Sequence, residues 1–319
     1  MGLNRLATRL GPLELRSPLL TASGTSGSSN EIESLAHHRR ILGALGAFVT
    51  KGVTLEPRRG NPLIRVIETR TGLLNSIGLQ NKGARAFLAE ELPRLVSYRI
   101  PVIVNISAGS VDEFARLAGV LLKKTGARNI AGLEINVSCP NIKKGGAAFG
   151  SDPRMVERVV KAVRQAAGPR ILIITKLSPN VTDITLPARA AIAAGTDALS
   201  LINTLRAMAI NIHTGKPALG NAVGGLSGPA IKPVGVFMVH QCFSRIPECR
   251  RQQIPLIGLG GISNWKDAIE YVMAGASAVA VGTAWFVNTN VFTEIHDGLS
   301  RFLAARKTTL SRLVGAAHQ

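Results

Sequence analysis

Cysteine is scarce in this chain of 319 residues, which has only Cys139, Cys242 and Cys249. Three thiols cannot build a disulfide framework for a chain of this size, nor a four-thiolate iron–sulfur site. The sequence also lacks an uncharged apolar run long enough to cross a bilayer, and its first residues lack the apolar core of a signal peptide. We therefore expect a cytoplasmic protein with no membrane segment.

Aromatic residues are also few, at 4% of the chain, although 46% of the residues are hydrophobic. Small and aliphatic residues therefore supply most of the apolar mass. This composition argues against an aromatic-rich β-sandwich and favours buried parallel strands covered by helices.

Acidic residues are half as numerous as basic ones, 19 against 38, which gives a formal net charge of +19. Such a charge could indicate a nucleic-acid partner. Basic residues are, however, scattered from Arg5 to Arg312, with no long basic run and no interleaved aromatics. We therefore favour a basic surface that attracts anionic substrates, and expect no nucleic-acid partner. The six histidines show no metal-ligand spacing, so we expect no metal site.

A repeated unit fills the chain after a short segment, Leu6 to Leu15, that could form a hairpin. Each unit is an apolar run of strand length, a Gly- or Ser-rich break and a helical pattern. The candidate strands are Pro18–Ala22, Ala47–Lys51, Pro101–Asn105, Gly132–Asn136, Ile171–Leu177, Ala198–Asn203, Pro255–Gly258 and Ala278–Gly282. The candidate helices are Asn30–Leu42, Ala84–Val96, Val111–Thr125, Pro153–Ala167, Leu186–Ala194, Pro229–Phe243, Trp265–Ala274 and Val291–Ala305. Eight units predict an α/β fold, a closed (β/α)8 TIM barrel, and no linker divides residues 1–319, so we expect a single domain.

Three connections are too long to be simple turns: Gly52 to Asn81, Pro140 to Ser151, and Thr204 to Ser227. All three follow predicted strands, which places them as long insertions at the carboxyl-end face, where barrel enzymes build their sites. This asymmetry favours catalysis over a structural role.

Glycines follow the last two predicted strands, in Gly258-Leu259-Gly260-Gly261 and in Gly282-Thr283. Backbone N–H groups can approach a phosphate closely at such positions, and many barrels bind phosphate after strands seven and eight. The alternative is tight turns in a Gly-rich barrel. The spacing does not match a Rossmann dinucleotide fingerprint.

Polar side chains end several otherwise apolar strands. Lys51 and Lys176 each close such a run, where a buried ammonium is costly unless an anion meets it. Amides recur at the same edge, at Asn75, Asn105, Asn136, Asn180 and Asn203. Several amides at successive strand ends suggest a planar, hydrogen-bonding ligand such as a pyrimidine or a flavin edge.

Cys139 lies in a polar turn directly after the strand Gly132–Asn136. A free cysteine is more often a small buried hydrophobe than a catalyst. Its polar neighbours favour an acid–base role, for which a thiol with a reference pKa near ~8.5 serves best at alkaline pH. Cys242 and Cys249 have no such neighbours, and we interpret them as structural.

These motifs together resemble the dihydroorotate dehydrogenase family, and specifically the class 1B catalytic (FMN) subunit. The residues that carry the resemblance are Ala22 to Thr25, Lys51-Gly52, Asn75 to Asn81, Asn136 to Asn141, Gly145 to Gly150, Lys176 to Asn180, Ile202 to Thr204, Gly224 to Gly228 and the two glycine sites. The resemblance implies an FMN-containing (β/α)8 barrel that oxidises (S)-dihydroorotate to orotate in de novo pyrimidine (UMP) biosynthesis, with FMN as the hydride acceptor.

The resemblance also implies roles for individual residues. Cys139 would be the base that takes the proton from substrate C5 while hydride leaves C6 for flavin N5. The substrate-binding residues would be Lys51, Asn75, Ser76, Ile77, Gly78, Leu79, Asn136, Asn203 and Thr204. The FMN-binding residues would be Ser23, Lys51, Gly52, Asn105, Asn136, Lys176, Ile202, Gly228, Gly260, Gly261, Gly282 and Thr283.

The class 1B resemblance further implies a partner subunit that holds FAD and a [2Fe–2S] cluster and passes electrons to NAD. The assembly would be a homodimer of this chain, or a heterotetramer with that subunit. Two other readings stay open: a dihydropyrimidine dehydrogenase-like flavoenzyme that acts on uracil or dihydrouracil, and a class 1A-like enzyme that uses another electron acceptor.

Overall fold

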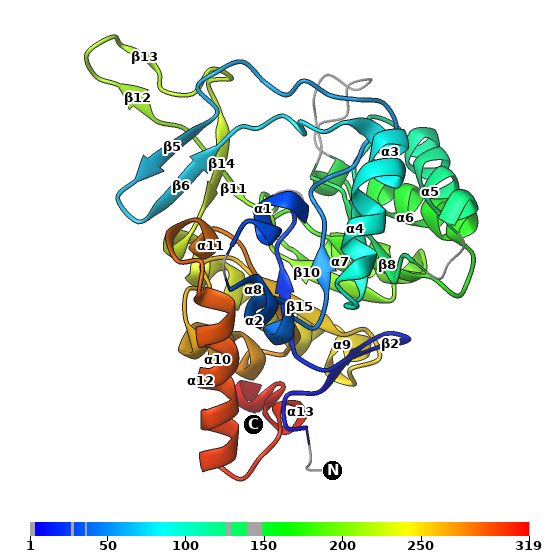
Figure 1. Ribbon diagram of the computed structural model, residues 1–319, viewed down its shortest axis with the longest axis vertical. Coiled ribbons are helices and arrows are strands. Elements are labelled where there is room, and N and C mark those ends of the chain that lie inside the picture. The colour runs from blue at the N-terminus through cyan, green and yellow to red at the C-terminus, as the bar shows by residue number, and fades with distance from the viewer. Residues whose placement is uncertain (1–3, 27–28, 36, 126–128, 139–148, 319) are drawn as a thin grey trace.

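The computed structural model describes residues 4–26, 29–35, 37–125, 129–138 and 149–318. Its centre is an eight-stranded parallel sheet in which the strands follow the order β3-β16-β15-β10-β9-β8-β7-β4 (Figure 1). A parallel bridge between Leu20 and Ala47 joins β3 to β4 and closes this sheet into a barrel. The strands are β3 (Leu19–Thr21), β4 (Phe48–Val49), β7 (Val102–Ile106), β8 (Gly132–Asn136), β9 (Leu172–Lys176), β10 (Ala198–Leu201), β15 (Leu256–Leu259) and β16 (Ala276–Val281). The predicted (β/α)8 barrel is confirmed.

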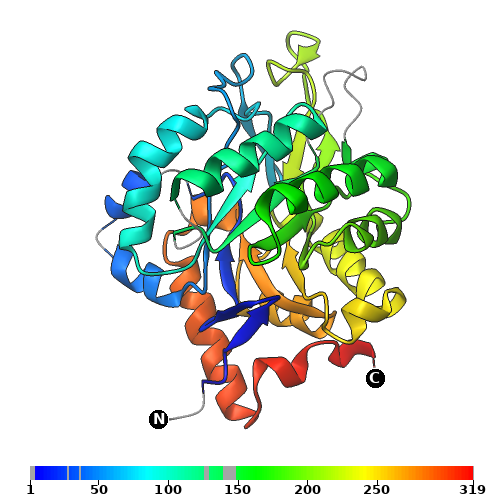
Figure 2. The same cartoon turned by 90° about the vertical axis from the view of Figure 1, so that its right-hand side faces the viewer.

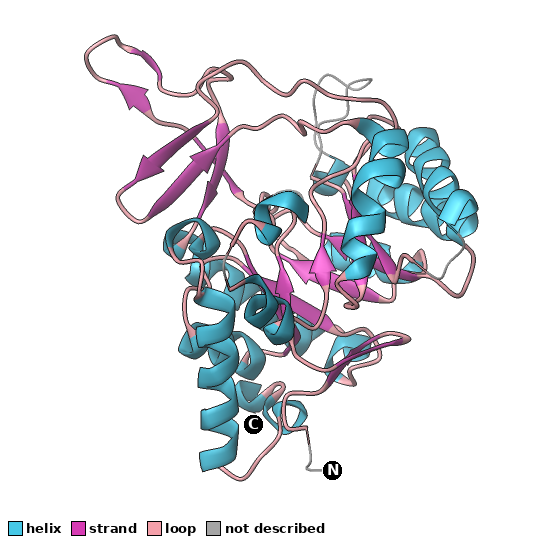
Figure 3. Cartoon of the chain, in the orientation of Figure 1, coloured by secondary structure: helices cyan, strands magenta, loops and turns pink. Residues whose placement is uncertain are grey.

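Helices surround this barrel, as Figures 2 and 3 show. The longer ones are α2 (His38–Ala44), α5 (Val111–Thr125), α6 (Pro153–Ala167), α7 (Thr185–Ala193), α8 (Lys232–Arg245), α10 (Trp265–Met273) and α12 (Val291–Ala305). The segment after β6 is continuous but changes its winding, from α3 (Gly83–Ala86) through a π-helical stretch, Phe87–Glu91, to α4 (Leu92–Ser97). Short helices are α1 (Ser29–Glu33), α9 (Pro247–Arg250), α11 (Ala284–Val287) and α13 (Leu310–Leu313), with 3-10 turns at Phe149–Ser151, Pro229–Ile231 and Ala316–His318.

Alternation along the barrel strands separates the core into two apolar layers. In β7, Val102 and Val104 pack outward against the helices, whereas Ile103 belongs to the cluster inside the barrel. In β9, Ile173 faces outward and Ile174 inward in the same way. Both faces are buried, so these strands are continuous hydrophobic runs, as the sequence suggested.

The amino-terminal hairpin closes the end of the barrel where the strands begin. It pairs β1 (Thr8–Leu10) with β2 (Leu13–Leu15), and Leu10 and Leu15 join the interior cluster. The Thr8 hydroxyl donates to the carbonyl of Ser277 at the start of β16 over 2.7 Å. Figure 2 shows this hairpin at the lower end of the molecule, so ligands must enter from the opposite end.

A second, four-stranded antiparallel sheet stands over the carboxyl ends of the barrel strands (Figure 1). Its order is β11-β14-β6-β5, formed by β5 (Val66–Thr69), β6 (Gly72–Asn75), β11 (Leu205–Ala207) and β14 (Gly224–Ser227). The hairpin of β12 (Ile210–Asn211) and β13 (Lys216–Pro217) extends from it. This covering sheet comes from two of the three long predicted connections, whereas most of the third, residues 139–148, lies outside the described residues.

One predicted helix is wrong. The pattern over Asn30–Leu42 predicted a single helix, but the chain forms α1 and α2 with a break between them. The Ser34 hydroxyl donates to the carbonyl of Glu31 over 2.7 Å, a local bond of the kind that competes with helical hydrogen bonding. Across the described ranges, no helix is long and apolar enough to cross a membrane.

Candidate active site

A cavity of about 1420 Å³ opens at the carboxyl ends of the barrel strands, beneath the covering sheet. Each predicted binding residue lines it: Ser23, Lys51, Gly52, Asn75, Ser76, Ile77, Gly78, Leu79, Asn105, Asn136, Lys176, Ile202, Asn203, Thr204, Gly228, Gly260, Gly261, Gly282 and Thr283. The structure therefore brings together residues that are up to 260 positions apart in the chain. Cys139 lies outside the described residues, but Ser138, which precedes it, is part of the lining.

Glycines after β15 let the backbone form one wall of the cavity. Gly260 and Gly261 have φ angles of +123° and +71°, which side-chain-bearing residues rarely adopt. A Cβ atom on Gly261 would lie 2.7 Å from the Lys232 Cβ and 2.9 Å from the Gly228 carbonyl oxygen. Only glycine fits here, and the exposed peptide edge is suited to an anionic group such as a phosphate.

Tyr271 on α10 lies directly behind this wall and was not predicted from the sequence. Its hydroxyl donates to the Gly260 carbonyl over 2.8 Å, and burial raises the pKa of Tyr271, so that the group stays a donor. In a trans peptide the carbonyl and the following N–H point in opposite directions, so the Gly261 N–H points away from Tyr271. The Tyr271 side chain occupies space left free by two glycines. A Cβ on Gly235 would lie 1.9 Å from the Tyr271 hydroxyl, and a Cβ on Gly258 would lie 2.4 Å from the Tyr271 ring.

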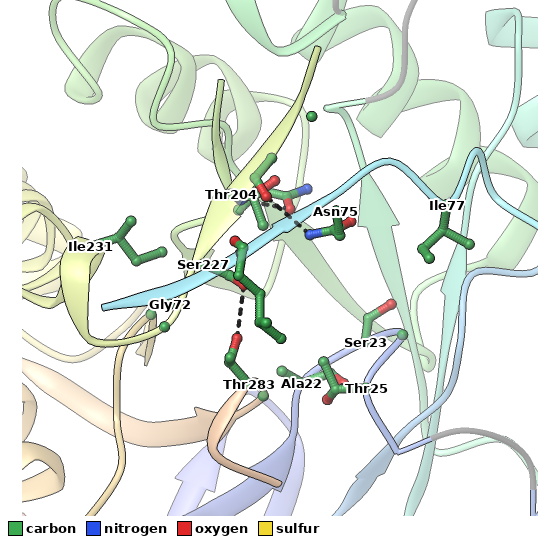
Figure 4. Close-up of a pocket in the computed structure, with 18 of the residues that line it drawn as sticks. Ala22, Ser23, Thr25, Gly72, Asn75, Ile77, Thr204, Ser227, Ile231 and Thr283 are labelled. Carbon is green, nitrogen blue, oxygen red and sulfur yellow. Dashed lines mark hydrogen bonds between the residues drawn. The ribbon is translucent and has the colours of Figure 1, made fainter. Parts of the chain in front are cut away.

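The covering sheet and the barrel meet at the edge of the same wall. The Thr283 hydroxyl, after β16, donates to the hydroxyl of Ser227 at the end of β14 over 2.9 Å. Figure 4 shows these two side chains pointing toward each other, with Asn75, at the end of β6, and Thr204, which precedes β11, farther away. The Asn75 amide donates to the Gly225 carbonyl over 3.2 Å, so β6 and β14 are also linked by a side chain from the lining. The Thr283–Ser227 bond therefore links the barrel to its cover, and the Asn75–Gly225 bond is a link within the cover.

Amide groups converge at another part of the lining, as the sequence predicted. The Asn203 side-chain nitrogen donates to Asn136 Oδ1 over 3.2 Å, and the same oxygen accepts from the Ser138 backbone N–H over 3.1 Å. Asn203 Oδ1 in turn accepts from the Thr204 N–H over 2.8 Å. Each amide is therefore oriented by protein partners, which makes the group suitable for binding a planar ligand with fixed donors and acceptors.

Two lysines border the cavity. Lys176 is the last residue of β9 and is only 5% exposed, and the described part of the chain gives it no ion pair. Lys51 follows β4 and is partly exposed. An ammonium that lines a cavity is stabilised when a ligand brings negative or electron-rich atoms to it.

A buried carboxylate that was not predicted from the sequence lies under the lining. Glu134 in β8 is 4% exposed and accepts hydrogen bonds from the Asn105 side chain over 2.7 Å and from the Ser200 hydroxyl over 2.9 Å. The one available signal was an acidic residue inside an otherwise apolar strand, Leu133-Glu134-Ile135. Charged residues are rarely buried without a specific partner, so this signal could have been used.

The two other cysteines are remote from this chemistry. Cys242 and Cys249 are free and buried, and burial raises the pKa of both thiols, that of Cys249 to about 12. Neither lines the cavity. In the described ranges, no three His, Cys, Asp or Glu side chains gather in a way that could hold a metal ion.

The chain is similar to known proteins over nearly its whole length. The family model described as dihydroorotate dehydrogenase matches residues 5–303. The chain is 48% identical over 312 residues, 98% of both chains, to a protein of Pelobacter propionicus named dihydroorotate dehydrogenase B (NAD(+)), catalytic subunit. A protein with the same name from Desulforudis audaxviator is also 48% identical, over 316 residues that cover 99% of this chain and 98% of that protein. Another, from Desulforamulus reducens, is 48% identical over 314 residues that cover 98% of each chain.

Proposed function

Because the chain belongs to the dihydroorotate dehydrogenase family, we propose that it oxidises (S)-dihydroorotate to orotate in de novo pyrimidine biosynthesis. The observation that carries this proposal is the single cavity that contains every predicted binding residue in the described ranges. We further propose that residues 1–319 act as one FMN-binding barrel domain.

The lining suits FMN at both of its ends. The glycine wall at Gly260 and Gly261, with Gly282 and Thr283 beside it, would hold the phosphate, because a backbone without Cβ atoms allows close approach. Two buried oxygens, Asn105 Oδ1 and Ser138 Oγ, have no hydrogen-bond partner within the described ranges, and they suit a ring that carries polar edge atoms. When bound, FMN would supply the acceptor for the hydride from substrate C6.

The cationic and amide groups would hold the remaining parts of both molecules. Lys176 would stabilise negative charge on the isoalloxazine ring, and Lys51 would meet the substrate carboxylate. Asn75, Asn136 and Asn203 would fix the orientation of the pyrimidine ring. The remaining FMN contacts would come from Ser23, Gly52, Asn105, Ile202 and Gly228, and the remaining substrate contacts from Ser76, Ile77, Gly78, Leu79 and Thr204.

We assign Cys139 as the base that accepts the proton from substrate C5. The assignment is supported by sequence position, since Cys139 directly follows Ser138, which belongs to the lining and whose buried Oγ has no hydrogen-bond partner among the described residues. A thiolate is the active form of such a base, so the reaction should accelerate as the pH approaches the thiol pKa.

The relatives' printed name, a catalytic subunit of an NAD(+)-dependent enzyme, supports a partner for this chain. We propose that electrons pass to NAD through a second subunit that holds FAD and a [2Fe–2S] cluster. The assembly would be a homodimer of this chain, extended to a heterotetramer by the partner, in the cytoplasm.

The test is to purify the chain, load it with FMN and add dihydroorotate without oxygen. We expect the yellow flavin absorbance to bleach as the cofactor is reduced, and dihydrouracil to have little effect because it lacks the carboxylate that Lys51 would meet. Bleaching by dihydrouracil instead would favour the dihydropyrimidine dehydrogenase-like reading. No bleaching by either compound in an FMN-replete sample would refute the proposal. Adding fumarate or NAD to the reduced protein, with and without the partner subunit, then separates the class 1A-like and class 1B acceptors.

A further inference from the structure

We propose that Glu134 is a positioning residue of the cofactor site, which fixes the Asn105 amide so that its oxygen is left to accept a hydrogen bond from the ligand. The inference rests on the proposed function, because the ligand is taken to be FMN. Glu134 itself does not line the cavity, so it would act only through Asn105.

The chemistry of the contact decides which way the amide faces. Glu134 Oε1 lies 2.7 Å from the Asn105 side-chain nitrogen, and Glu134 Oε2 accepts from Ser200 over 2.9 Å. Both Glu134 oxygens act as acceptors in these contacts, so the Asn105 atom that faces Oε1 is the nitrogen. Turning the amide over would put two oxygens in contact within a buried site. One orientation is therefore compulsory.

This orientation leaves one acceptor unused. Asn105 Oδ1 is buried and has no hydrogen-bond partner in the described structure, although Asn105 lines the cavity. Gly52 lies beside it, and a Cβ there would stand 3.2 Å from this oxygen, so glycine keeps the oxygen's surroundings open. The Asn105 backbone is also held, because its N–H donates to the Thr50 hydroxyl over 3.1 Å. The side chain therefore presents a fixed, unpaired acceptor.

An unpaired buried acceptor is stabilised by a donor from the ligand. In the oxidised isoalloxazine ring the only N–H is at N3, in the imide group. The geometry thus points to Asn105 Oδ1 as an acceptor for that N–H, and to Glu134 as the group that selects this polarity.

A glutamine at position 134 would not select one orientation of the Asn105 amide. Either end of a Gln side chain could face Asn105, because the Ser200 hydroxyl can donate or accept at the other end. Both orientations of the Asn105 amide would then satisfy the inner contacts. The binding-competent orientation would fall to about half of the molecules, which weakens apparent affinity about twofold.

Four variants of the full chain test this role. Three are the single substitutions Glu134→Gln, Glu134→Leu and Asn105→Asp, and the fourth is the double variant Asn105→Asp with Glu134→Gln, called the exchange because it swaps the amide and the carboxylate. Asn105→Asp alone places two carboxylates together, and we expect the FMN dissociation constant to rise by about 100-fold. The exchange restores one amide and one carboxylate in reverse order, with an Asp oxygen left as the free acceptor. We expect its FMN affinity to return to within about tenfold of the wild type. Glu134→Gln should lose about twofold and Glu134→Leu at least about tenfold.

Three readouts separate positioning from general stability: FMN affinity by fluorescence quenching, denaturant unfolding of the cofactor-free protein, and the flavin midpoint potential. The exchange moves the negative charge onto the residue that lines the cavity, so its midpoint potential should be lower than that of the wild type, whereas Glu134→Gln should raise it. If Asn105→Asp does not fold, the comparison of the exchange with Glu134→Leu decides the matter.

The inference would be overturned if the exchange bound FMN no more tightly than Asn105→Asp or Glu134→Leu, while the wild type bound it well. That result would leave the proposed function intact. Failure of the wild type itself to bind FMN would overturn both, so the two failures can be told apart.

Discussion

Tyr271→Phe is the sharpest test of how the glycine wall is held. The substitution removes one hydroxyl and leaves the ring, so the space beside Gly258 stays filled, whereas the space beside Gly235, which the hydroxyl occupies, opens. What is lost is the 2.8 Å hydrogen bond to the Gly260 carbonyl, and with it the contact that holds the Gly260–Gly261 peptide with its N–H pointing away from Tyr271. We therefore expect an effect on both stability and phosphate binding.

The size of the effect follows from burial. Tyr271 is fully buried, and loss of its hydroxyl leaves the Gly260 carbonyl without that donor, which should cost about 1–3 kcal/mol of unfolding free energy. For a chain of this size the melting temperature should fall by roughly 2–4 °C per kcal/mol. If the freed peptide then samples both directions equally, binding of the phosphate should weaken by about twofold, or ~0.4 kcal/mol.

The assay compares FMN with riboflavin, which has the same ring and lacks the phosphate. Flavin fluorescence titration of wild type and Tyr271→Phe should show a weaker FMN affinity with an unchanged riboflavin affinity, and denaturant unfolding gives the stability term. Equal losses for both flavins would mean that Tyr271 supports the ring or the whole barrel. No loss for either flavin would refute the reasoning about the peptide orientation.

Three further predictions use other parts of the site. Gly261→Ala should destabilise the protein by at least about 1–2 kcal/mol and weaken FMN binding, because φ is +71° at Gly261 and the new Cβ would lie 2.7 Å from the Lys232 Cβ. An unchanged melting temperature would contradict this prediction. Burial raises the pKa of Asp267, but hydrogen bonds from Lys232 and Ser263 outweigh it and hold the pKa below its usual range. The stability that this carboxylate contributes is therefore complete above its ordinary pKa of about 3.9 and is lost as the pH falls through the lowered value. Asp267→Asn should cost stability at neutral pH and progressively less in acid, and unfolding at several pH values would test this. Cys139→Ser should keep FMN bound but slow flavin reduction by dihydroorotate strongly, with partial recovery at high pH; an unaffected reduction rate in stopped-flow mixing would exclude Cys139 as the base.

The barrel and its rim could be predicted because their signals are local. Each β-run, such as Ile171–Leu177, is followed by a break and a helical pattern, and parallel strands place all following residues at one edge. The covering sheet could not be predicted in this way. Its central pairing joins Gly225 to Asn75, 150 residues apart, and the strand Gly224–Ser227 has no β-branched residue to mark it. Tertiary contact, and not local propensity, decides that segment.

The role of Glu134 could not be predicted from the sequence for a second reason, because it depends on the register of the strands and not on a sequence motif. Its partners are Asn105, directly across the β7–β8 ladder, and Ser200 in β10, and neither contact can be inferred before the strands are aligned.

Once the strands are aligned, the barrel interior changes character along its axis. Toward the amino ends the inward residues are apolar, as at Ile103 and Ile174, and two positions farther along the same strands they are Asn105 and Lys176. Hydrophobic burial therefore stabilises the closed end, whereas the open end depends on hydrogen bonds that fix each polar group in one orientation. A substitution such as Asn105→Asp should consequently weaken ligand binding much more than a substitution of equal size among the apolar residues near the hairpin. A substitution near the hairpin should instead lower the stability of the fold.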